Sequence, residues 1–403
     1  MGPKVSVLIP SYNHAHYLVY ALDSVVSQSF SDWEAIVIDD GSTDDTQRVT
    51  VQFDDPRIKY IYQENQGLSA ARNTGIRAAN ADIIALLDAD DIWRVDFLEM
   101  MLVPFDSRPE AVAVYCGFQY IDENGQDVGI PSLKVVPPNE FRDYFAANGN
   151  WLVPSGVVFR KVIAEKEGCF DESLRAVEDA YLWSKMSYVG PFVGIPLPLV
   201  GYRRHDANMS SDPQRMVSSN YKILERHHGP PQGDTSTWTE RKKYIYTRYF
   251  RSAAIRYLAF GDLQMSAYLF LRMQEITPQA GTEIGTWRSL ARVHLPIEIR
   301  NAPNVIEWQS AERDILGLLA ELEKMKPNSN ILDERYSMIS GSAYLALADE
   351  AFRAGQFALA YKWMWLAFKN HKSLILTRPY WGALGRGING VLFRNGTIDL
   401  KRT

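Results

Sequence analysis

The stretch Ile83-Ile84-Ala85-Leu86-Leu87-Asp88-Ala89-Asp90-Asp91 decides the fold class. Five apolar residues in a row suit a buried parallel strand, and three carboxylates follow within four positions. Open α/β sheets bind ligands beyond the carboxyl ends of their strands. Mg²⁺ and Mn²⁺ take carboxylate oxygens and complete their coordination with substrate phosphates. The stretch therefore predicts either a metal site for a diphosphate or an acidic turn in which Asp91 caps a helix over 93–101.

Strand-like and helix-like segments alternate around this stretch. The other strand-like segments are 5–9, 33–38, 58–62, 111–116 and 153–159. Helix-periodic segments lie between the earlier ones, which predicts a mostly parallel, Rossmann-like α/β sheet with helices on both faces. No Gly-x-Gly-x-x-Gly follows the first strand, and no Gly-Lys-Ser/Thr occurs in the chain. These absences argue against a dinucleotide dehydrogenase and a P-loop NTPase.

The second part of the 403-residue chain has a different pattern. The Gly- and Pro-rich segment 229–234 is typical of an interdomain linker, and the strand signals fade beyond it. We expect an α/β domain over residues 1–220 and an all-α domain over 221–403. Arg256–Asp262 and Glu350–Gln356 resemble each other, as helix-turn-helix repeats do, but two copies favour an ordinary helical bundle.

The charge differs between these halves. Residues 1–220 hold 18 Lys and Arg against 31 Asp and Glu, whereas residues 221–403 hold 25 against 17. The basic half suits an anionic surface or acceptor. Cations alternate with aromatics over 241–251, a pattern that fits either peripheral membrane contact or, preferably, a packed helix. No nucleic-acid-binding motif accompanies the charge, so nucleic acid is not an expected partner.

Three further features indicate the cellular compartment. The chain has only two cysteines, Cys116 and Cys169, and no apolar run of 18 residues. Its first residues approach a strand and do not resemble a signal peptide. We therefore expect a cytoplasmic protein, either soluble or peripheral at the inner face of the plasma membrane.

Five motifs fall in one order along the chain. They are Val7–Asn13, Ile38–Asp44, Asn65-Gln66-Gly67 with Ala71–Gly75, Leu87–Asp91, and Glu178-Asp179 with Leu182-Trp183. Together they resemble the inverting family 2 glycosyltransferases of the GT-A fold, over about residues 4–215. Members of this family transfer a sugar from a nucleoside diphosphate donor to an acceptor.

The resemblance implies roles for residues near the donor. Pro10, Tyr12 and Asp40 would line a uridine pocket, and Arg72 would reach the nucleotide or its diphosphate. Asp88-Ala89-Asp90 would be the Asp-x-Asp motif, in which Asp88 contacts the ribose or the metal through water. Asp90 would ligate Mn²⁺ or Mg²⁺ directly, and the ion would neutralise the departing diphosphate.

The resemblance also implies the groups that act on the acceptor. Inverting transfer needs a base opposite the leaving group, and Asp179 would be that base, with Glu178 holding the acceptor or the local backbone. His205 would complete the metal shell or touch the diphosphate. Arg203 and Arg204 are further candidates for phosphate contact.

The sequence therefore predicts an inverting, metal-dependent transferase that uses a UDP-sugar as donor and a hydroxyl of a glycan, glycolipid or glycoprotein as acceptor. Bacterial members of the family commonly build surface polysaccharides, lipid-linked glycans or protein glycans. One alternative is an inactive nucleotide-sugar-binding scaffold. Another is a nucleotidyltransferase, which would carry a Gly-rich basic loop in place of residues 10–13.

Overall fold

A computed structural model describes residues 2–129, 132–148, 150–205, 213–292 and 308–372. Contacts divide the chain into two compact units, Met1–Ile223 and Leu224–Thr403. The division falls within helix α8 (Pro213–His228), near the expected one after residue 220. Segment 229–234 was expected to link the domains, but it joins α8 to α9 (Glu240–Ala259) inside the second unit.

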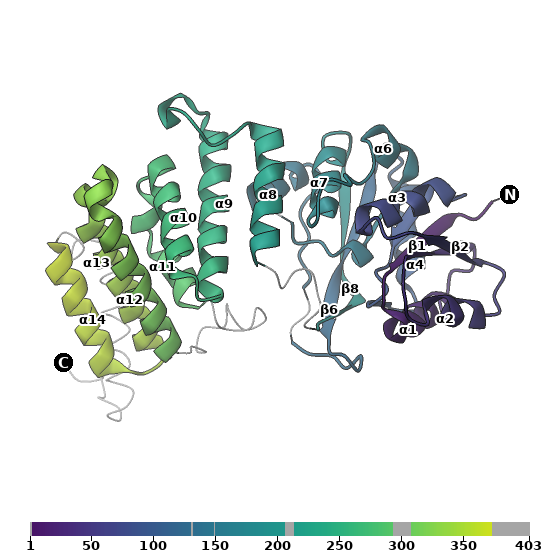
Figure 1. Cartoon of the computed structure of the whole chain (residues 1–403), viewed down its shortest axis with the longest axis horizontal. Helices are drawn as coiled ribbons and strands as arrows, with labels where there is room; N and C mark the ends of the chain where they lie inside the picture. Colours follow the sequence, from purple (N-terminus) through teal and green to yellow (C-terminus); the bar gives the residue numbers. More distant parts are fainter. Residues whose placement is uncertain (1, 130–131, 149, 206–212, 293–307, 373–403) are drawn as a thin grey trace, which may run out of the picture. The chain divides into compact units, whose positions relative to one another are not determined.

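The first unit is built on one eight-stranded sheet (Figure 1). Its order is β3-β2-β1-β4-β7-β6-β8-β5. The strands are β1 (Val5–Ser11), β2 (Trp33–Asp40), β3 (Ile58–Gln63), β4 (Ile83–Leu86), β5 (Ile92–Trp93), β6 (Ala113–Ile121), β7 (Val157–Arg160) and β8 (Phe192–Arg203). β1 to β4 pair in parallel, as do β6 and β8, whereas β7 is antiparallel to both of its neighbours. The predicted mostly parallel sheet is confirmed.

Helices cover both faces of this sheet. They are α1 (Ala15–Val26), α2 (Thr46–Gln52), α3 (Leu68–Ala78), α4 (Phe97–Ser107), α5 (Phe141–Asn148), α6 (Lys161–Lys166) and α7 (Glu178–Met186). One apolar cluster buries Leu22 of α1 and Met101 of α4 against the sheet. A second cluster buries Ile76 of α3 and Trp183 of α7. Successive residues of β1, β2 and β4 alternate between the two clusters, which accounts for the continuous apolar runs in the sequence.

One turn and one helix start are local features of this unit. The chain turns over 122–125, with Gly125 at φ +81° and its N–H donating to the Asp122 carbonyl at 3.0 Å. The predicted start of the helix over 93–101 was wrong. The short strand β5 intervenes, and α4 begins at Phe97 with Asp96 as its N-cap residue. Asp91 therefore caps no helix.

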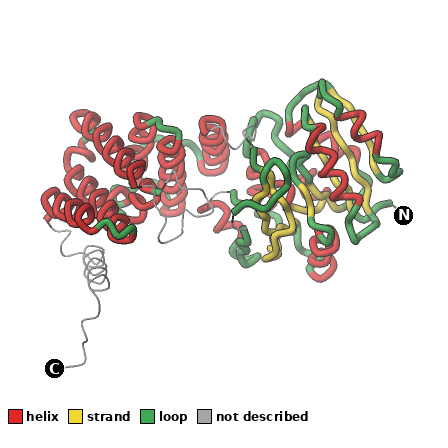
Figure 2. Tube along the Cα trace, turned by 90° about the horizontal axis from the view of Figure 1, so that it is seen from below, coloured by secondary structure: helices red, strands yellow, loops and turns green. Residues whose placement is uncertain are grey.

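The described part of the second unit is helical (Figure 2). After α8 and α9 come α10 (Leu263–Ile276), α11 (Ile284–Ala291), α12 (Trp308–Met325), α13 (Asn330–Arg353) and α14 (Phe357–Asn370). Gly261 turns the chain between α9 and α10, and Gly355 does so between α13 and α14, at φ +80° and +71°. The two similar sequence stretches thus form the turns of two helix pairs. None of the described helices has the length and apolarity needed to span a bilayer.

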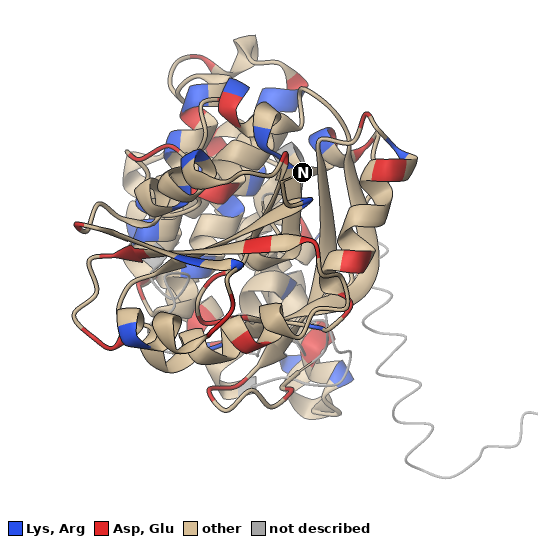
Figure 3. Ribbon diagram, turned by 90° about the vertical axis from the view of Figure 1, so that its right-hand side faces the viewer, with Lys and Arg blue, Asp and Glu red and all other residues tan. Residues whose placement is uncertain are grey.

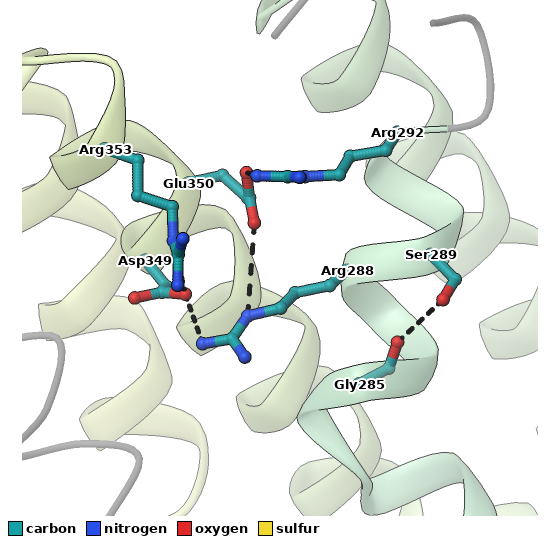
Figure 4. Close-up of polar contacts among 7 residues, drawn as sticks. All are labelled: Gly285, Arg288, Ser289, Arg292, Asp349, Glu350 and Arg353. Carbon is teal, nitrogen blue, oxygen red and sulfur yellow. Dashed lines mark hydrogen bonds and ion pairs between the residues drawn. The ribbon is translucent and has the colours of Figure 1, made fainter. Parts of the chain in front are cut away.

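A buried ion-pair cluster fastens α11 to α13 (Figure 4). Asp349 and Glu350 are fully buried on α13. Arg288 pairs with Asp349, and the Arg292 Nη2 atom lies 2.7 Å from the Glu350 Oε2 atom. Arg353 adds a third cation, with its Nε atom 3.3 Å from Asp349. The cluster compensates two carboxylates that burial alone would destabilise.

We expect Asp349→Ala to lower the free energy of unfolding by about 3–5 kcal/mol, because the partnered arginines lose a buried counter-charge. Urea unfolding followed by tryptophan fluorescence measures the change. Asp333→Ala is the control on the same helix, since the Asp333 side chain is 73% exposed. Equal stabilities of the two variants would contradict a stabilising role for the cluster.

Candidate active site

The carboxylates after β4 lie at the carboxyl end of the parallel sheet, as the sequence predicts. The Leu87 N–H donates to the Leu8 carbonyl at 3.0 Å, which carries the pairing with β1 up to the acidic residues. The backbone N–H of Asp88 then donates to the Ser155 Oγ atom at 3.0 Å. The strand therefore ends in a fixed position and delivers Asp88 and Asp90 to this edge.

Arg72 joins the two sets of acidic residues. It lies on α3 and is buried, yet its Nη2 atom donates to Asp88 Oδ1 at 2.7 Å and its Nη1 atom to Glu178 Oε1 at 2.5 Å. The two carboxylates raise the pKa of Arg72 against the opposing effect of burial. Arg72 therefore links the end of β4 to the first turn of α7. Its expected contact with a nucleotide stays a prediction.

Asp179 is buried beside Glu178 in the first turn of α7. Burial and the neighbouring Glu178 carboxylate raise the pKa of Asp179 to about 7, while Arg72 and the Asn150 amide oppose the rise. Asn150 Nδ2 donates to Asp179 Oδ2 at 2.8 Å, and Asn150 Oδ1 accepts the Leu152 N–H at 3.0 Å. The second bond fixes the amide orientation, so Asn150 holds one oxygen of Asp179.

Two histidines and one aspartate meet beside the β4 end. One ligand atom from each of His14, Asp90 and His205 lies within 4.8 Å of the others, and the Asp90 Oδ2 atom is 3.0 Å from His205 Nε2. Burial lowers the pKa of His14. This donor set fits a divalent metal ion, because neutral imidazole and carboxylate are both metal ligands. The sequence reasoning named Asp90 and His205 but missed His14.

Asp91 is a buried support for this edge. Its Oδ2 atom accepts the Ser155 hydroxyl at 2.6 Å, and its Oδ1 atom accepts the Arg203 N–H at 2.9 Å. Burial and the nearby Asp90 and Asp88 carboxylates raise the pKa of Asp91 well above its usual value. Ser155 also accepts from Asp88, so it ties the acidic loop to the segment before β7.

Arg203 holds two loops together near the same edge. Its guanidinium donates to the carbonyls of Asp90, Asp122 and Glu123 at 2.7–2.9 Å. It also lies over the Tyr17 ring, 4.8 Å from the centroid. These contacts occupy the side chain with protein groups, so a phosphate contact of Arg203 has no support in this arrangement.

The residues expected to line a nucleotide pocket lie at the ends of β1 and β2. Pro10 is buried in β1, and Tyr12 follows it with 49% of its surface exposed. Asp40 ends β2 and accepts three bonds, from Gln63 Nε2 at 2.7 Å, the Gln66 N–H at 2.9 Å and the Gly67 N–H at 2.8 Å. Asp40 thus anchors the loop before α3 as well as being a candidate contact for a base.

Comparisons with known proteins identify the family of the chain. Residues 6–160 match the profile described as Glycosyl transferase family 2. An uncharacterised glycosyltransferase of Nostoc sp. is 33% identical over 213 residues, covering 51% of this chain and 66% of that protein. A putative teichuronic acid biosynthesis glycosyltransferase of Bacillus subtilis is 30% identical over 234 residues, covering 56% of this chain and 90% of that protein. The chain belongs to glycosyltransferase family 2.

A solved structure extends the likeness beyond the sheet. Residues 1–349 of TarS from S. aureus superimpose with a TM-score of 0.50 at 15% identity, covering 81% of this chain and 92% of that one. At this identity the likeness is one of fold. The predicted GT-A fold followed by a helical part is confirmed.

Proposed function

We propose that the protein is an inverting, metal-dependent glycosyltransferase that moves a sugar from a UDP-sugar to a hydroxyl acceptor. The observation that carries the proposal is the buried bridge of Arg72, which bonds Asp88 on one side and Glu178 on the other. The bridge therefore joins the expected donor-binding edge to Glu178, the residue next to the candidate base Asp179. Inverting transfer needs this proximity, because attack and departure occur on opposite sides of one carbon.

The donor would be held by residues after β1, β2 and β4. Tyr12 offers an exposed ring for stacking on uracil, Asp40 an acceptor for its imide N–H, and Asp88 an acceptor for the ribose. Asp90 and His205 would hold Mn²⁺ or Mg²⁺. The ion supplies charge neutralisation at the diphosphate. The choice of uridine rests on the family resemblance of Pro10, Tyr12 and Asp40.

Asp179 would take the proton of the acceptor hydroxyl. Its Oδ2 atom accepts from Asn150, and we assign Oδ1 to the incoming O–H. As the acceptor oxygen bonds to the anomeric carbon, the bond from that carbon to the UDP oxygen breaks, and the proton passes to Asp179. A pKa near 7 matches this task, because about half of the carboxyl groups are ionised at neutral pH and the carboxylate is basic enough to accept a proton.

The biological role would be the synthesis of a bacterial surface polysaccharide. The Bacillus subtilis relative, a putative teichuronic acid biosynthesis glycosyltransferase, supports this role. We assign donor binding and catalysis to residues 1–220 and acceptor binding to the helical residues 221–403. Figure 3 shows acidic and basic residues interspersed over the ribbon.

One experiment tests the proposed reaction. The full chain is incubated with Mn²⁺, a panel of α-linked UDP-sugars and fragments of bacterial polysaccharide, and UDP release is measured. Proton NMR of the product should show the β configuration at the transferred sugar. A retained α configuration would overturn the inverting mechanism, and absence of UDP release with every donor would overturn the proposed donor class.

The pH dependence follows from the raised pKa of Asp179. Below about pH 7 the carboxyl is protonated and cannot accept a proton, so kcat should fall about tenfold per pH unit on the acid side and level off above it. Initial rates between pH 5 and 9 at saturating donor measure this limb. A rate that is flat from pH 5 to 8 would contradict the assignment.

Asn150→Ala should move the same limb to higher pH. The hydrogen bond from the Asn150 amide stabilises the ionised form of Asp179, so loss of this hydrogen bond raises the pKa of the Asp179 carboxyl. The kcat profile again measures the shift. Asn80→Ala is the control, because Asn80 bonds Glu34 at the other end of the sheet. An unshifted midpoint in Asn150→Ala would show that the amide does not hold the base.

A further inference from the structure

We propose that His14 is a third protein ligand of the metal, and that the resulting site of two imidazoles and one carboxylate selects first-row transition ions such as Mn²⁺ and Co²⁺ over Mg²⁺ and Ca²⁺. The inference rests on the proposed function, whose metal ligands are Asp90 and His205. It narrows the choice between Mn²⁺ and Mg²⁺ that the sequence leaves open.

The geometry places three ligand atoms around one point. His14 lies in the β1–α1 loop, Asp90 follows β4 and His205 follows β8, so three separate segments converge. Their ligand atoms lie within 4.8 Å of one another, and all three residues are partly buried. Ligands bound to one ion at about 2.1 Å must lie within about 4.2 Å of each other, so small side-chain rotations suffice.

The loop that carries His14 is fixed by contacts unrelated to a metal. The Asn13 N–H donates to Ser42 Oγ at 3.0 Å, and Asn13 Oδ1 accepts the Thr43 N–H at 2.8 Å. On the other side of His14, the Ala15 N–H donates to Asp44 Oδ2 at 2.9 Å. The backbone of His14 is therefore held between two anchored neighbours, so that only a rotation of its side chain is needed for binding.

The composition of the site determines its preference. Asp88, the other carboxylate of the Asp-x-Asp motif, is bonded to Arg72, so Asp90 is the carboxylate that meets the two imidazoles. Mg²⁺ and Ca²⁺ prefer oxygen ligands, whereas transition ions accept imidazole nitrogen, with affinity rising from Mn²⁺ to Co²⁺. Removal of His14 should therefore cost transition ions more than Mg²⁺.

The direct test is pulsed electron paramagnetic resonance of Mn²⁺ bound to the full chain with UDP. The wild type should show nitrogen couplings from two imidazoles, and His14→Ala should show those of one. His16→Ala is the matched control, because His16 is an exposed histidine two residues away that is absent from the ligand cluster. It should keep both couplings.

Calorimetry supplies a second readout that does not depend on turnover. In the presence of UDP, His14→Ala should weaken Mn²⁺ binding by about tenfold or more, and Mg²⁺ binding by much less. Mn²⁺ binding with one nitrogen coupling in the wild type, unchanged by His14→Ala, would overturn this inference and leave the proposed function standing. Failure of the wild type to bind Mn²⁺ with UDP would overturn both.

Discussion

Asp179→Asn should lower the rate of sugar transfer by about 10²–10⁴-fold while leaving the affinity for the UDP-sugar nearly unchanged. The amide has the shape of the carboxyl group but cannot take a proton from the acceptor. The buried position of Asp179 in α7 and its bond from Asn150 hold the group in place, so the loss is chemical in origin. Steady-state kinetics give the rate, and calorimetry with Mn²⁺ gives the donor affinity.

Asp82→Asn is the matched control for this substitution. Asp82 is an exposed aspartate immediately before β4, at the opposite end of the strand from Asp88 and Asp90. Its substitution should alter neither rate nor affinity. If Asp179→Asn retains full activity, another group is the base and the assignment of α7 to the acceptor side fails.

Asp90→Ala should abolish the metal-dependent part of UDP binding. Asp90 contributes the carboxylate of the metal cluster, and without it the two imidazoles have no anionic partner among the clustered ligands. Calorimetric titration of UDP with Mn²⁺ and with EDTA measures the difference. In the wild type Mn²⁺ should strengthen binding, whereas in Asp90→Ala the two titrations should coincide.

Asp82→Ala is the control for this second experiment. It removes a carboxylate next to the same strand without touching the metal cluster. If Asp90→Ala still binds UDP more tightly with Mn²⁺ than with EDTA, then Asp90 is not a ligand that the nucleotide needs.

Most of the sheet could be predicted from local sequence. Buried parallel strands are apolar on both faces, so β1, β2 and β4 stand out as continuous runs. The short strand β5 could not be foreseen, because two residues carry no periodicity and its pairing with β8 spans about a hundred positions. The alternative in which Asp91 caps a helix was wrong because its actual partners, Ser155 and Arg203, are distant in sequence.

The candidate site was predictable where family motifs mark it. Asp88, Asp90, Asp179 and Glu178 were named from sequence, and the structure joins Asp88 to Glu178 through Arg72. Asp90 lies instead beside His14 and His205, and Asp179 accepts a bond from Asn150. The contributions of His14, Asn150 and Ser155 depend on which loops adjoin in the folded sheet. His14 directly follows the motif residues 7–13. Because β1 pairs with β4, this position after β1 is the feature of the sequence that could have indicated His14 as a neighbour of Asp90.

The most direct test of the central claim is calorimetric titration of the full chain with UDP, GDP and CDP in the presence of Mn²⁺ and again with EDTA. The account predicts that UDP binds most tightly and that its affinity falls when EDTA removes the ion. Equal binding of all three nucleotides, or UDP affinity that is the same with and without Mn²⁺, would contradict it.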